Sequence, residues 1–411
     1  MYAAIFSLRS PWYVADVEVD ERRVQVTVTV AARSEARLRC PECGKACPGY
    51  DTKPRTWRHL DTCQYTTIVT AEVPRIECSK HGVLQVEVPW AEPGSGFTAL
   101  MESAVIEWLL EANTAAVARR MRLTWDEVDG VKQRAVRRGL RRRQLGEIRR
   151  IGVDETSYQK RHEYVTVVSD LETGCVLHVA DDRTGESLGE FWDFLGPARC
   201  ASLEAIAMDM APPYIRSTLA RVPGARDKIC FDRFHIAKML NDAVNTVRKQ
   251  ERRELRAAGE TDVLAGTKYL WTQNPENMPE ARVQRFEELR GQALKVGRAW
   301  SIKETARGLW GYAMRSWAVK AWTKWIAWAL RSRLEPMAHV ARTIREQLWG
   351  IVNAIVLRVT NARAEALNAR IQWIKNQACG YRNRQRFKDA ILFHLGGLDL
   401  HPRPALAHTK A

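Results

Sequence analysis

The sequence lacks any apolar run of the roughly 18 residues that a membrane-spanning helix requires. Its first nine residues also lack the charged start and the longer apolar stretch of a secretory signal peptide. These absences argue against an integral membrane protein and against a secreted one. We therefore expect a soluble, intracellular protein.

Acidic residues are few relative to basic ones. The chain of 411 residues has 64 Lys and Arg against 48 Asp and Glu, which gives a formal net charge of +16. Such an excess is typical of proteins that bind a polyanion, and nucleic acid is the partner that we expect. Hydrophobic residues make up 45% of the chain, so it can build real cores and is not a disordered basic tail.

Cysteine is scarce outside one short segment, because five of the nine cysteines lie between residues 40 and 78. This clustering favours metal binding over disulfide bonds. A gap of two residues lets Cys40 and Cys43 reach one tetrahedral ion, and Cys78 and His81 repeat that spacing. We therefore predict one structural zinc ion held by Cys40, Cys43, Cys78 and His81. Free cysteines without metal are the alternative, and the rival ligands are Cys47, His59 and Cys63.

Changes in apolar periodicity divide the chain. Residues 14–19 and 24–30 alternate apolar and polar side chains, which predicts a β-hairpin leading into a zinc-binding module over residues 1–95. Helical spacing follows, and residues 96–147 resemble a helix-turn-helix whose recognition helix is capped by Thr124. An ordinary helical linker with a solvated basic face is the alternative. The cations of this region that we expect to contact DNA are Lys132, Arg134, Arg137, Arg138, Arg141 and Arg142.

From residue 148 the pattern predicts an α/β domain. Three strands, a helix and then a strand is the order of an RNase H-like fold. We expect the first part of this catalytic core over residues 148–235, an all-helical insertion over 236–350, the last core helix and C-terminal helices over 351–400, and a tail over 401–411. The expected strands are near 149–154, 163–169 and 174–180, followed by a helix near 186–195, a strand ending at Asp209 and a strand at 229–232.

Two of the expected strands end in carboxylates, Asp154 and Asp209, and a late basic helix carries Glu365 between Asn361 and Asn368. Three acids suffice for a site of two Mg²⁺ or Mn²⁺ ions that catalyses phosphoryl transfer. Lys375 and Arg382 follow as cations for phosphate. The rival acids are Glu155, Asp170, Asp181, Asp182 and Asp232, of which Asp232 is the strongest because it ends its own strand and neighbours His235.

Eight tryptophans lie in or next to the expected helical insertion. Trp310, Trp317 and Trp328 share one helical face, which predicts a buried core or a dimer seam rather than base stacking. Trp322 lies off that face and is the candidate for a functional contact.

The chain resembles the transposases of the ISL3 insertion-sequence family over nearly its whole length. The motifs that carry this resemblance are Cys40-Pro41-Glu42-Cys43, Val88-Pro89-Trp90-Ala91, Gly152-Val153-Asp154-Glu155, Met208-Asp209-Met210, Phe231-Asp232-Arg233-Phe234-His235 and Thr360-Asn361-Ala362-Arg363-Ala364-Glu365.

The resemblance implies a zinc-binding N-terminal region, a helix-turn-helix and an RNase H-like catalytic domain with the acids Asp154, Asp209 and Glu365, and we expect Arg363 to hold phosphate. It further implies that this chain is a prokaryotic protein that is associated with the nucleoid when bound to DNA. The expected activity is cleavage of double-stranded DNA at terminal inverted repeats and its joining to target DNA. Recognition of two ends implies a dimer or larger assembly. A DNA-binding regulator and an RNase H-like nuclease, both derived from a transposase, are the alternatives.

Overall fold

The structure is a computed structural model that describes residues 1–33, 38–159, 163–274, 276, 278–292, 294–359 and 362–402, without the side chains of residues 362–365. The chain divides into two compact units. Unit 1 comprises Met1–Gln144, Gln377–Cys379 and Gln385–Ala411, and unit 2 comprises Leu145–Asn376 and Gly380–Arg384. None of the described helices has the length and the apolar character that crossing a membrane requires.

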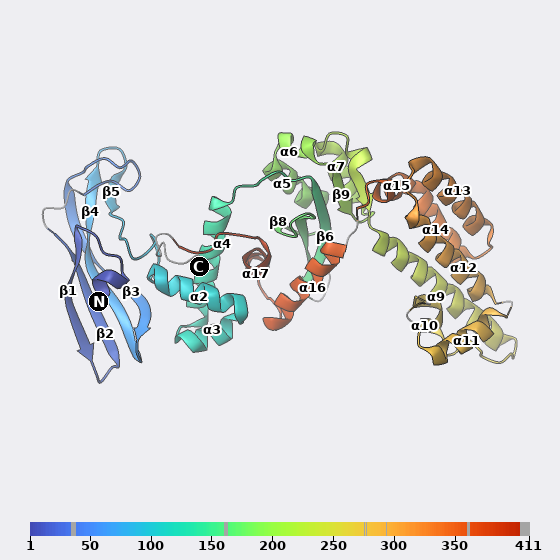
Figure 1. Cartoon of the computed structure of the whole chain (residues 1–411), viewed down its shortest axis with the longest axis horizontal. Coiled ribbons are helices and arrows are strands. Elements are labelled where there is room, and N and C mark those ends of the chain that lie inside the picture. Colours follow the sequence, from blue (N-terminus) through green and yellow to red (C-terminus); the bar gives the residue numbers. More distant parts are fainter. Residues whose placement is uncertain are drawn as a thin grey trace. The chain divides into compact units, whose positions relative to one another are not determined.

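Unit 1 begins with a five-stranded sheet (Figure 1). Its strands run in the order β1-β2-β4-β3, and β5 pairs with β4. The predicted hairpin is confirmed, because β1 and β2 are antiparallel with Val17 opposite Val28. Val28, Val69 and Val73 are fully buried, as alternation along a half-buried strand requires. The elements are α1 (Tyr2–Ile5), β1 (Trp12–Asp20), β2 (Gln25–Ala32), β3 (Gly49–Thr62), β4 (Tyr65–Cys78) and β5 (Gly82–Gln85).

Three helices follow in unit 1, namely α2 (Ala99–Glu111), α3 (Thr114–Met121) and α4 (Trp125–Arg142). Each starts at a side chain that accepts a hydrogen bond from the first turn, and the predicted cap Thr124 forms a complete capping box with Glu127. Helix α17 (Arg384–Leu395) belongs almost wholly to unit 1, although the sequence grouped it with the catalytic core. Its Arg386 contacts Asp129 of α4 at 2.9 Å, which accounts for this placement.

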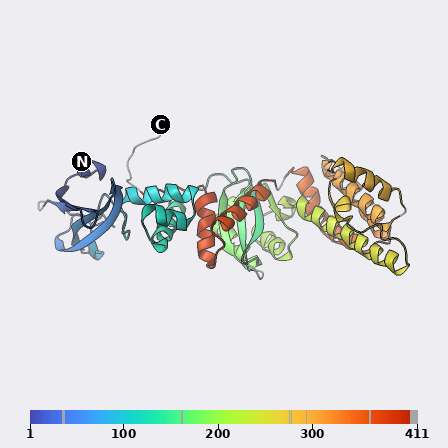
Figure 2. The same cartoon turned by 90° about the horizontal axis from the view of Figure 1, so that it is seen from below.

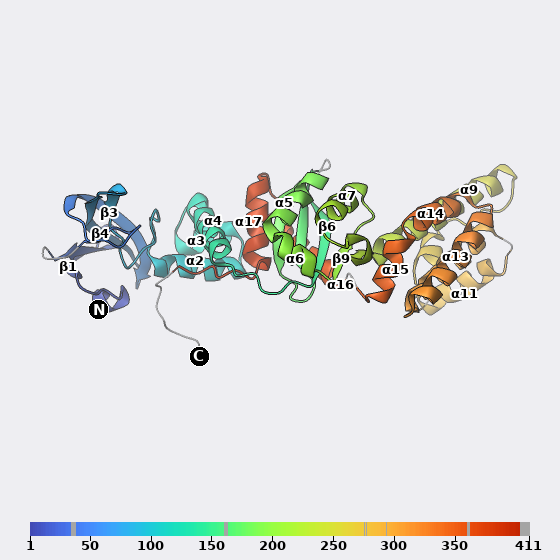
Figure 3. The same ribbon diagram turned by 90° about the horizontal axis from the view of Figure 1, so that it is seen from above.

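Unit 2 contains a second five-stranded sheet in the order β10-β9-β6-β7-β8. Strands β6, β7 and β8 are antiparallel neighbours, whereas β9 and β10 run parallel to β6. The predicted strands are present, but β6 continues to Gln159, so the prediction that Asp154 ends its strand is wrong. Helices α5 and α7 pack on each other beside this sheet (Figure 3). The elements are β6 (Arg150–Gln159), β7 (Glu163–Asp170), β8 (Val176–Asp181), α5 (Gly185–Leu195), α6 (Pro197–Ser202), β9 (Ala205–Met208), α7 (Pro212–Arg221), α8 (Ala225–Lys228) and β10 (Ile229–Phe231).

Helices fill the chain between β10 and the last helix of unit 2, α16 (Ala362–Gln377). The long helix α9 runs beside α12 and α14 (Figure 2). Asp232 caps α9 by accepting a hydrogen bond from the backbone N–H of Phe234 at 2.9 Å. The helices are α9 (Arg233–Ala257), α10 (Lys268–Thr272), α11 (Glu280–Arg290), α12 (Lys295–Gly308), the 3-10 helix η2 (Leu309–Gly311), α13 (Arg315–Arg331), α14 (Glu335–Glu346) and α15 (Leu348–Val356).

The buried face of α13 is not the predicted one. Trp322 is fully buried, so the prediction that it makes a functional contact is wrong. Trp317 is 55% and Trp328 37% exposed, so these two do not form the predicted core, and the alternative of a dimer seam stays a prediction. The buried stripe consists of Ala318, Trp322, Trp325 and Ala329, which follow one another at helical spacing. Counting the two alanines as core residues reveals this stripe, because a small side chain lets a neighbouring helix approach.

Candidate functional site

Three carboxylates lie on neighbouring strands in unit 2, Asp154 within β6, Asp209 directly after β9 and Asp232 directly after β10. Gly152 of β6 pairs with Ala207 of β9, and extending this parallel register by two residues places Asp154 beside Asp209. Phe231 of β10 pairs with Met208, so Asp232 follows next to Asp209 in the same way. We call Asp154, Asp209 and Asp232 the acid row. The strong rival Asp232 therefore lies together with the two predicted aspartates.

Asp154 is held in an environment that disfavours its charge. Burial, and then the charge of Asp209, raise the pKa of Asp154 to about 6. Its carboxylate accepts hydrogen bonds from the backbone N–H of Glu155 at 2.7 Å and from the Nδ2 of Asn368 at 2.5 Å. Two carboxylates that repel each other in a buried position form a site that a cation would stabilise.

The imidazole of His235 lies between the other two acids. Its Nδ1 is 2.5 Å from Asp209 Oδ1 and 3.0 Å from Asp232 Oδ2. The hydrogen bonds with Asp209 and then Asp232 raise the pKa of His235 to about 10, so it is an imidazolium at neutral pH. The ligand atoms of these three residues lie within 4.8 Å of one another. Asp232 thus contacts His235, its neighbour in the sequence, at 3.0 Å.

Helix α16 lies along β6 (Figure 1). Asn368 bonds to Asp154, Gln372 to the Oγ1 of Thr156 at 3.3 Å, and Lys375 donates to the carbonyl of Ser157 at 2.8 Å. These residues follow one another at steps of four and three, so one face of α16 meets the strand. Glu365 lies three residues before Asn368 on this helix, and its side chain is outside the described residues, as are the side chain of Arg363 and the whole of Asn361.

The donor set of the acid row suits a hard divalent cation. Mg²⁺ binds oxygen ligands and takes one or two carboxylates, with water and substrate phosphate completing its shell. Asp154 and Asp209 present such oxygens side by side, and burial, followed by the charge of Asp209, raises the pKa of Asp154, so a cation there would stabilise the ionised form. The residues present therefore fit divalent cations.

The four predicted zinc ligands come together in unit 1. Cys43 Sγ is 3.9 Å from Cys78 Sγ, and His81 Nδ1 is 3.5 Å from Cys40 Sγ and 3.7 Å from Cys78 Sγ. Bonds of about 2.0–2.3 Å to a tetrahedral zinc ion separate its ligands by about 3.5–3.8 Å, so this spacing fits zinc. We call these residues the Cys/His cluster. A glycine in the left-handed region follows each pair, with φ of 68° at Gly44 and 71° at Gly82.

Backbone N–H groups in the Cys/His cluster favour the thiolate form of Cys78. The backbone N–H groups of Lys80 and then His81 lower the pKa of Cys78 to about 6, which favours the form that binds metal. Of the rival ligands, His59 is buried and bonds to Thr98 Oγ1 at 2.8 Å, and Cys63 is exposed. Cys47 lies beside the cluster, and burial followed by the neighbouring thiols raises its pKa.

Several of the cations predicted to contact DNA are engaged within unit 1 instead. Arg138 is 2% exposed and bonds to Glu92 and Glu102, and Lys132 is buried against Asp129 at 2.8 Å. Arg134 bonds to Glu102, and Arg142 contacts Asp399. A buried guanidinium already paired with carboxylates is not available to phosphate. The predicted DNA-contact cations whose side chains are exposed are Arg137, Arg141 and, in unit 2, Arg382.

The remaining rival acids have other partners. Asp170 accepts hydrogen bonds from Glu172 and Thr173 and so shapes a turn. Glu155 faces Arg183, and Asp182 faces Arg384. Asp181 is the last residue of β8.

Known proteins match the chain along nearly all of its length. Residues 36–81 match the zinc finger of the transposases of IS204, IS1001, IS1096 and IS1165, residues 86–136 match the helix-turn-helix domain of transposase family ISL3, and residues 151–391 match the transposase domain of that family. The chain is 26% identical to the transposase of insertion sequence IS1557 from Mycobacterium tuberculosis, over 97% of this chain and 95% of that protein. It is also 26% identical to the transposase of IS1001 from Bordetella parapertussis, over 88% and 90% of the two chains.

Proposed function

Because this chain belongs to the ISL3 family of transposases, we propose that it binds the terminal inverted repeats of an insertion sequence and catalyses metal-dependent DNA cleavage and strand transfer. The observation that carries the catalytic part is the acid row, in which Asp154 and Asp209 adjoin across two parallel strands. We assign the sheet of unit 2 to an RNase H-like core on its strand order, with α9 to α15 as a helical insertion before α16.

The proposed catalytic acids are Asp154, Asp209 and Glu365. Glu365 is three residues before Asn368 on α16, and the amide of Asn368 bonds to Asp154, which supports Glu365 as the third acid. Asp154, Asp209 and Glu365 are the residues that would hold the two divalent ions. When bound, these ions activate the attacking water or 3′-hydroxyl and stabilise the leaving 3′-oxygen.

The chain's own residues position these groups. Asn368 fixes the carboxylate of Asp154, and the proton on Nδ1 of His235 holds Asp209 against Asp232. Exposed Arg137 and Arg141 on α4 are proposed to contact DNA phosphates, together with Arg363, Lys375 and Arg382 in unit 2. No side chain needs to act as a nucleophile. We further propose a dimer or larger assembly, because two DNA ends must be held at once.

The test uses purified protein, Mg²⁺ and a plasmid that carries the gene with its native flanking DNA. New 3′ ends at inverted repeats are expected, and Asp154→Asn should remove them while DNA binding in a gel-shift assay stays within about twofold. Arg23→Gln serves as the matched control for handling and purity, because Arg23 is exposed in unit 1 and its ion pair is with the nearby Asp20. Cleavage that survives in Asp154→Asn would exclude the assignment of this acid.

A further inference from the structure

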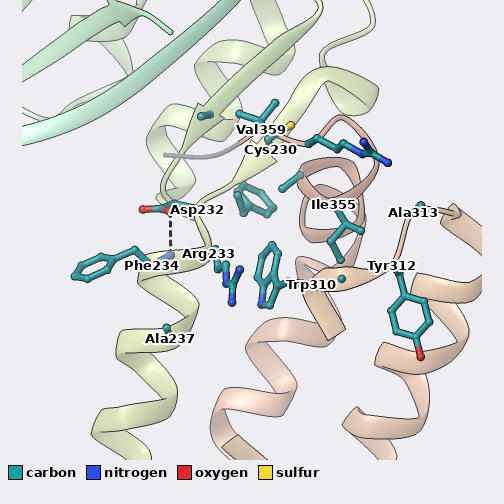
Figure 4. A pocket seen from close by; sticks show the side chains of 15 residues that line it. Cys230, Asp232, Arg233, Phe234, Ala237, Trp310, Tyr312, Ala313, Ile355 and Val359 are labelled. Atoms are coloured by element: carbon teal, nitrogen blue, oxygen red, sulfur yellow. Dashed lines mark hydrogen bonds between the residues drawn. The ribbon is translucent and has the colours of Figure 1, made fainter. Parts of the chain in front are cut away.

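A cavity of about 600 Å³ lies in unit 2 between β10, the start of α9, η2 and the end of α15 (Figure 4). This volume is within the range of about 300–1,000 Å³ that ligand pockets occupy. Its walls include Cys230, Asp232, Arg233, Trp310, Ile355 and Arg358. Asp232 is the member of the acid row that lines this cavity, whereas Asp154, Asp209, His235 and the Cys/His cluster are not among its lining residues.

The cavity adjoins the acid row on the same face of the sheet. Ala207 and Cys230, which pair across β9 and β10, both line it. Side chains two residues apart on a strand point to the same face, so Asp209 and Asp232 follow these two residues on the cavity's face. Asp232 itself belongs to the cavity wall. A DNA strand held at the acid row is therefore next to this cavity.

The cavity combines an aromatic wall with positive charge. Trp310 is half-buried and is supported by an edge-on contact with the buried Trp322 at 5.9 Å between ring centroids. The guanidinium of Arg233 lies over the Trp310 ring at 5.7 Å, and Arg358 is exposed at the rim. The carboxylate among the lining residues, Asp232, is engaged with the N–H of Phe234 and with His235.

We propose that this cavity binds one unpaired nucleobase of the DNA strand held at the acid row, stacked on Trp310, with the adjoining phosphate at Arg233 and Arg358. The ligand chemistry follows from the walls, since a planar aromatic group stacks on indole and guanidinium, and an anion satisfies the two arginines. Nucleic-acid enzymes extrude a nucleotide where the stacking surface offsets the lost pairing. The inference rests on the proposed function, because it takes DNA as the substrate.

The experiment compares two fluorescein-labelled duplexes of one sequence, one fully paired and one with a single unpaired 5-iodouridine. Fluorescence anisotropy with Ca²⁺ in place of Mg²⁺ measures the affinity of the full-length protein for each. We expect the bulged probe to bind about tenfold more tightly, since one stacked base contributes on that order. Irradiation should then cross-link the iodouridine to the peptide that contains Trp310, which mass spectrometry identifies.

The matched variants separate stacking from loss of structure. Trp310→Ala should reduce the preference for the bulged over the paired probe to less than about twofold and leave the affinity for the paired probe unchanged. Trp317→Ala changes an exposed tryptophan outside the cavity wall and should keep the full preference for the bulged probe. If Trp310→Ala does not fold, Trp310→Phe and Arg358→Gln are used in its place. Trp310→Phe should keep part of the preference for the bulged probe, and Arg358→Gln should reduce it.

Equal affinity of the wild-type protein for both probes, a preference that survives Trp310→Ala, or a cross-link to a peptide outside the cavity wall would each overturn the inference. These outcomes are distinct from failure of the proposed function. If the protein cuts the plasmid at inverted repeats but shows no preference for the bulge, only the cavity assignment is wrong. If the preference is present and no cleavage occurs under any divalent ion, only the catalytic assignment is wrong.

Discussion

The Cys/His cluster of unit 1 and the acid row of unit 2 gather metal-binding side chains by different means. In the cluster, two short turns each supply two ligands, and a glycine with positive φ follows each pair. In the acid row, each acid comes from a different strand, and the register of the sheet brings the three together. The cluster is therefore a product of local turn geometry, and the row a product of the whole fold.

The two sites also differ in how they handle charge without a metal. The acid row contains its own cation, the imidazolium of His235, which lies within 3.0 Å of two carboxylates. The described part of unit 1 places no such cation in the cluster, where the ligand atoms contact one another. We therefore expect the fold of unit 2 to tolerate an empty acid row, and the zinc module of unit 1 to depend on its ion.

The largest expected effect is therefore loss of zinc. Structural zinc contributes about 10–16 kcal/mol of apparent binding free energy, which in a small module is folding free energy. Cys78→Ser, or treatment with a strong chelator, should abolish the cooperative unfolding of the sheet of unit 1, measured by differential scanning calorimetry with metal release followed by a colorimetric dye. Cys63→Ser is the matched control, because this thiol is exposed and outside the cluster. A Cys78→Ser protein that retains one zinc ion and an unchanged melting profile would contradict the ligand assignment.

Removing one acid from the row should act on activity rather than on folding. Asp209→Asn should lower DNA cleavage by at least about a thousandfold, because several kcal/mol of transition-state stabilisation depend on the bound ions. Its melting temperature should change little, since the loss of the ion pair with His235 is offset by relief of the repulsion with Asp154.

Asp232→Asn is the comparison that sharpens this assignment. Asparagine also accepts the N–H of Phe234, so the cap of α9 is kept and the charge beside His235 alone is removed. We expect a cleavage rate reduced by about tenfold, the size of one hydrogen bond to a charged group. A larger loss in Asp232→Asn than in Asp209→Asn would exchange the roles of the two acids.

The two units should also respond to pH in opposite directions. Burial lowers the pKa of His59 to about 4, and its side chain is 4% exposed. A folded pKa below the unfolded value of about 6.5 means that stability is present above pH 6.5 and is lost as the pH falls towards 4. His235 has the opposite shift, so its contribution is present below pH 6.5 and is lost as the pH rises through about 10.

For His59 the expected loss of unfolding free energy between pH 7 and pH 5 is about 2 kcal/mol. Urea unfolding of zinc-saturated protein at both pH values measures it as the difference between the wild type and His59→Gln. Protonation of the zinc ligands is common to both proteins and cancels in that difference. The same pH dependence in both proteins would show that His59 is not the group responsible.

The sequence predicted those features that depend on local pattern. Apolar runs that end in a carboxylate identified Asp154 and Asp209, and two spacings of Cys and His identified the cluster. The long hairpin of β3 and β4 was not predicted from the sequence, because β3 is exposed over its first eight residues and carries no alternating apolar pattern there. Its inward residues Trp57 and His59 gave the available signal.

Partners distant in the chain explain why the basic residues of α4 were predicted poorly. Nothing near Arg138 in the sequence shows that Glu92 and Glu102 will surround it. The useful signal was Glu102 itself, an acid within the apolar stripe of α2 that would be costly to bury without a cation. Similarly, Asn368 could be placed on the face of Glu365 from the sequence, but its bond to Asp154 required the packing of α16 on β6.

That bond gives the finest test of the acid row, with an effect no larger than that expected for Asp232→Asn. Asn368→Ala removes the amide that holds the carboxylate of Asp154, so the cleavage rate should fall by about tenfold while the Kd for DNA stays within about twofold. Gln372→Ala is the matched control, because Gln372 contacts the same strand from the same helix face through Thr156 and no acid. If both substitutions lower cleavage equally, α16 contributes through its packing on β6 and not through the orientation of Asp154. If Asn368→Ala instead lowers the cleavage rate tenfold more than Gln372→Ala, the amide of Asn368 orients Asp154. The acid row then depends both on the register of the sheet and on helix α16.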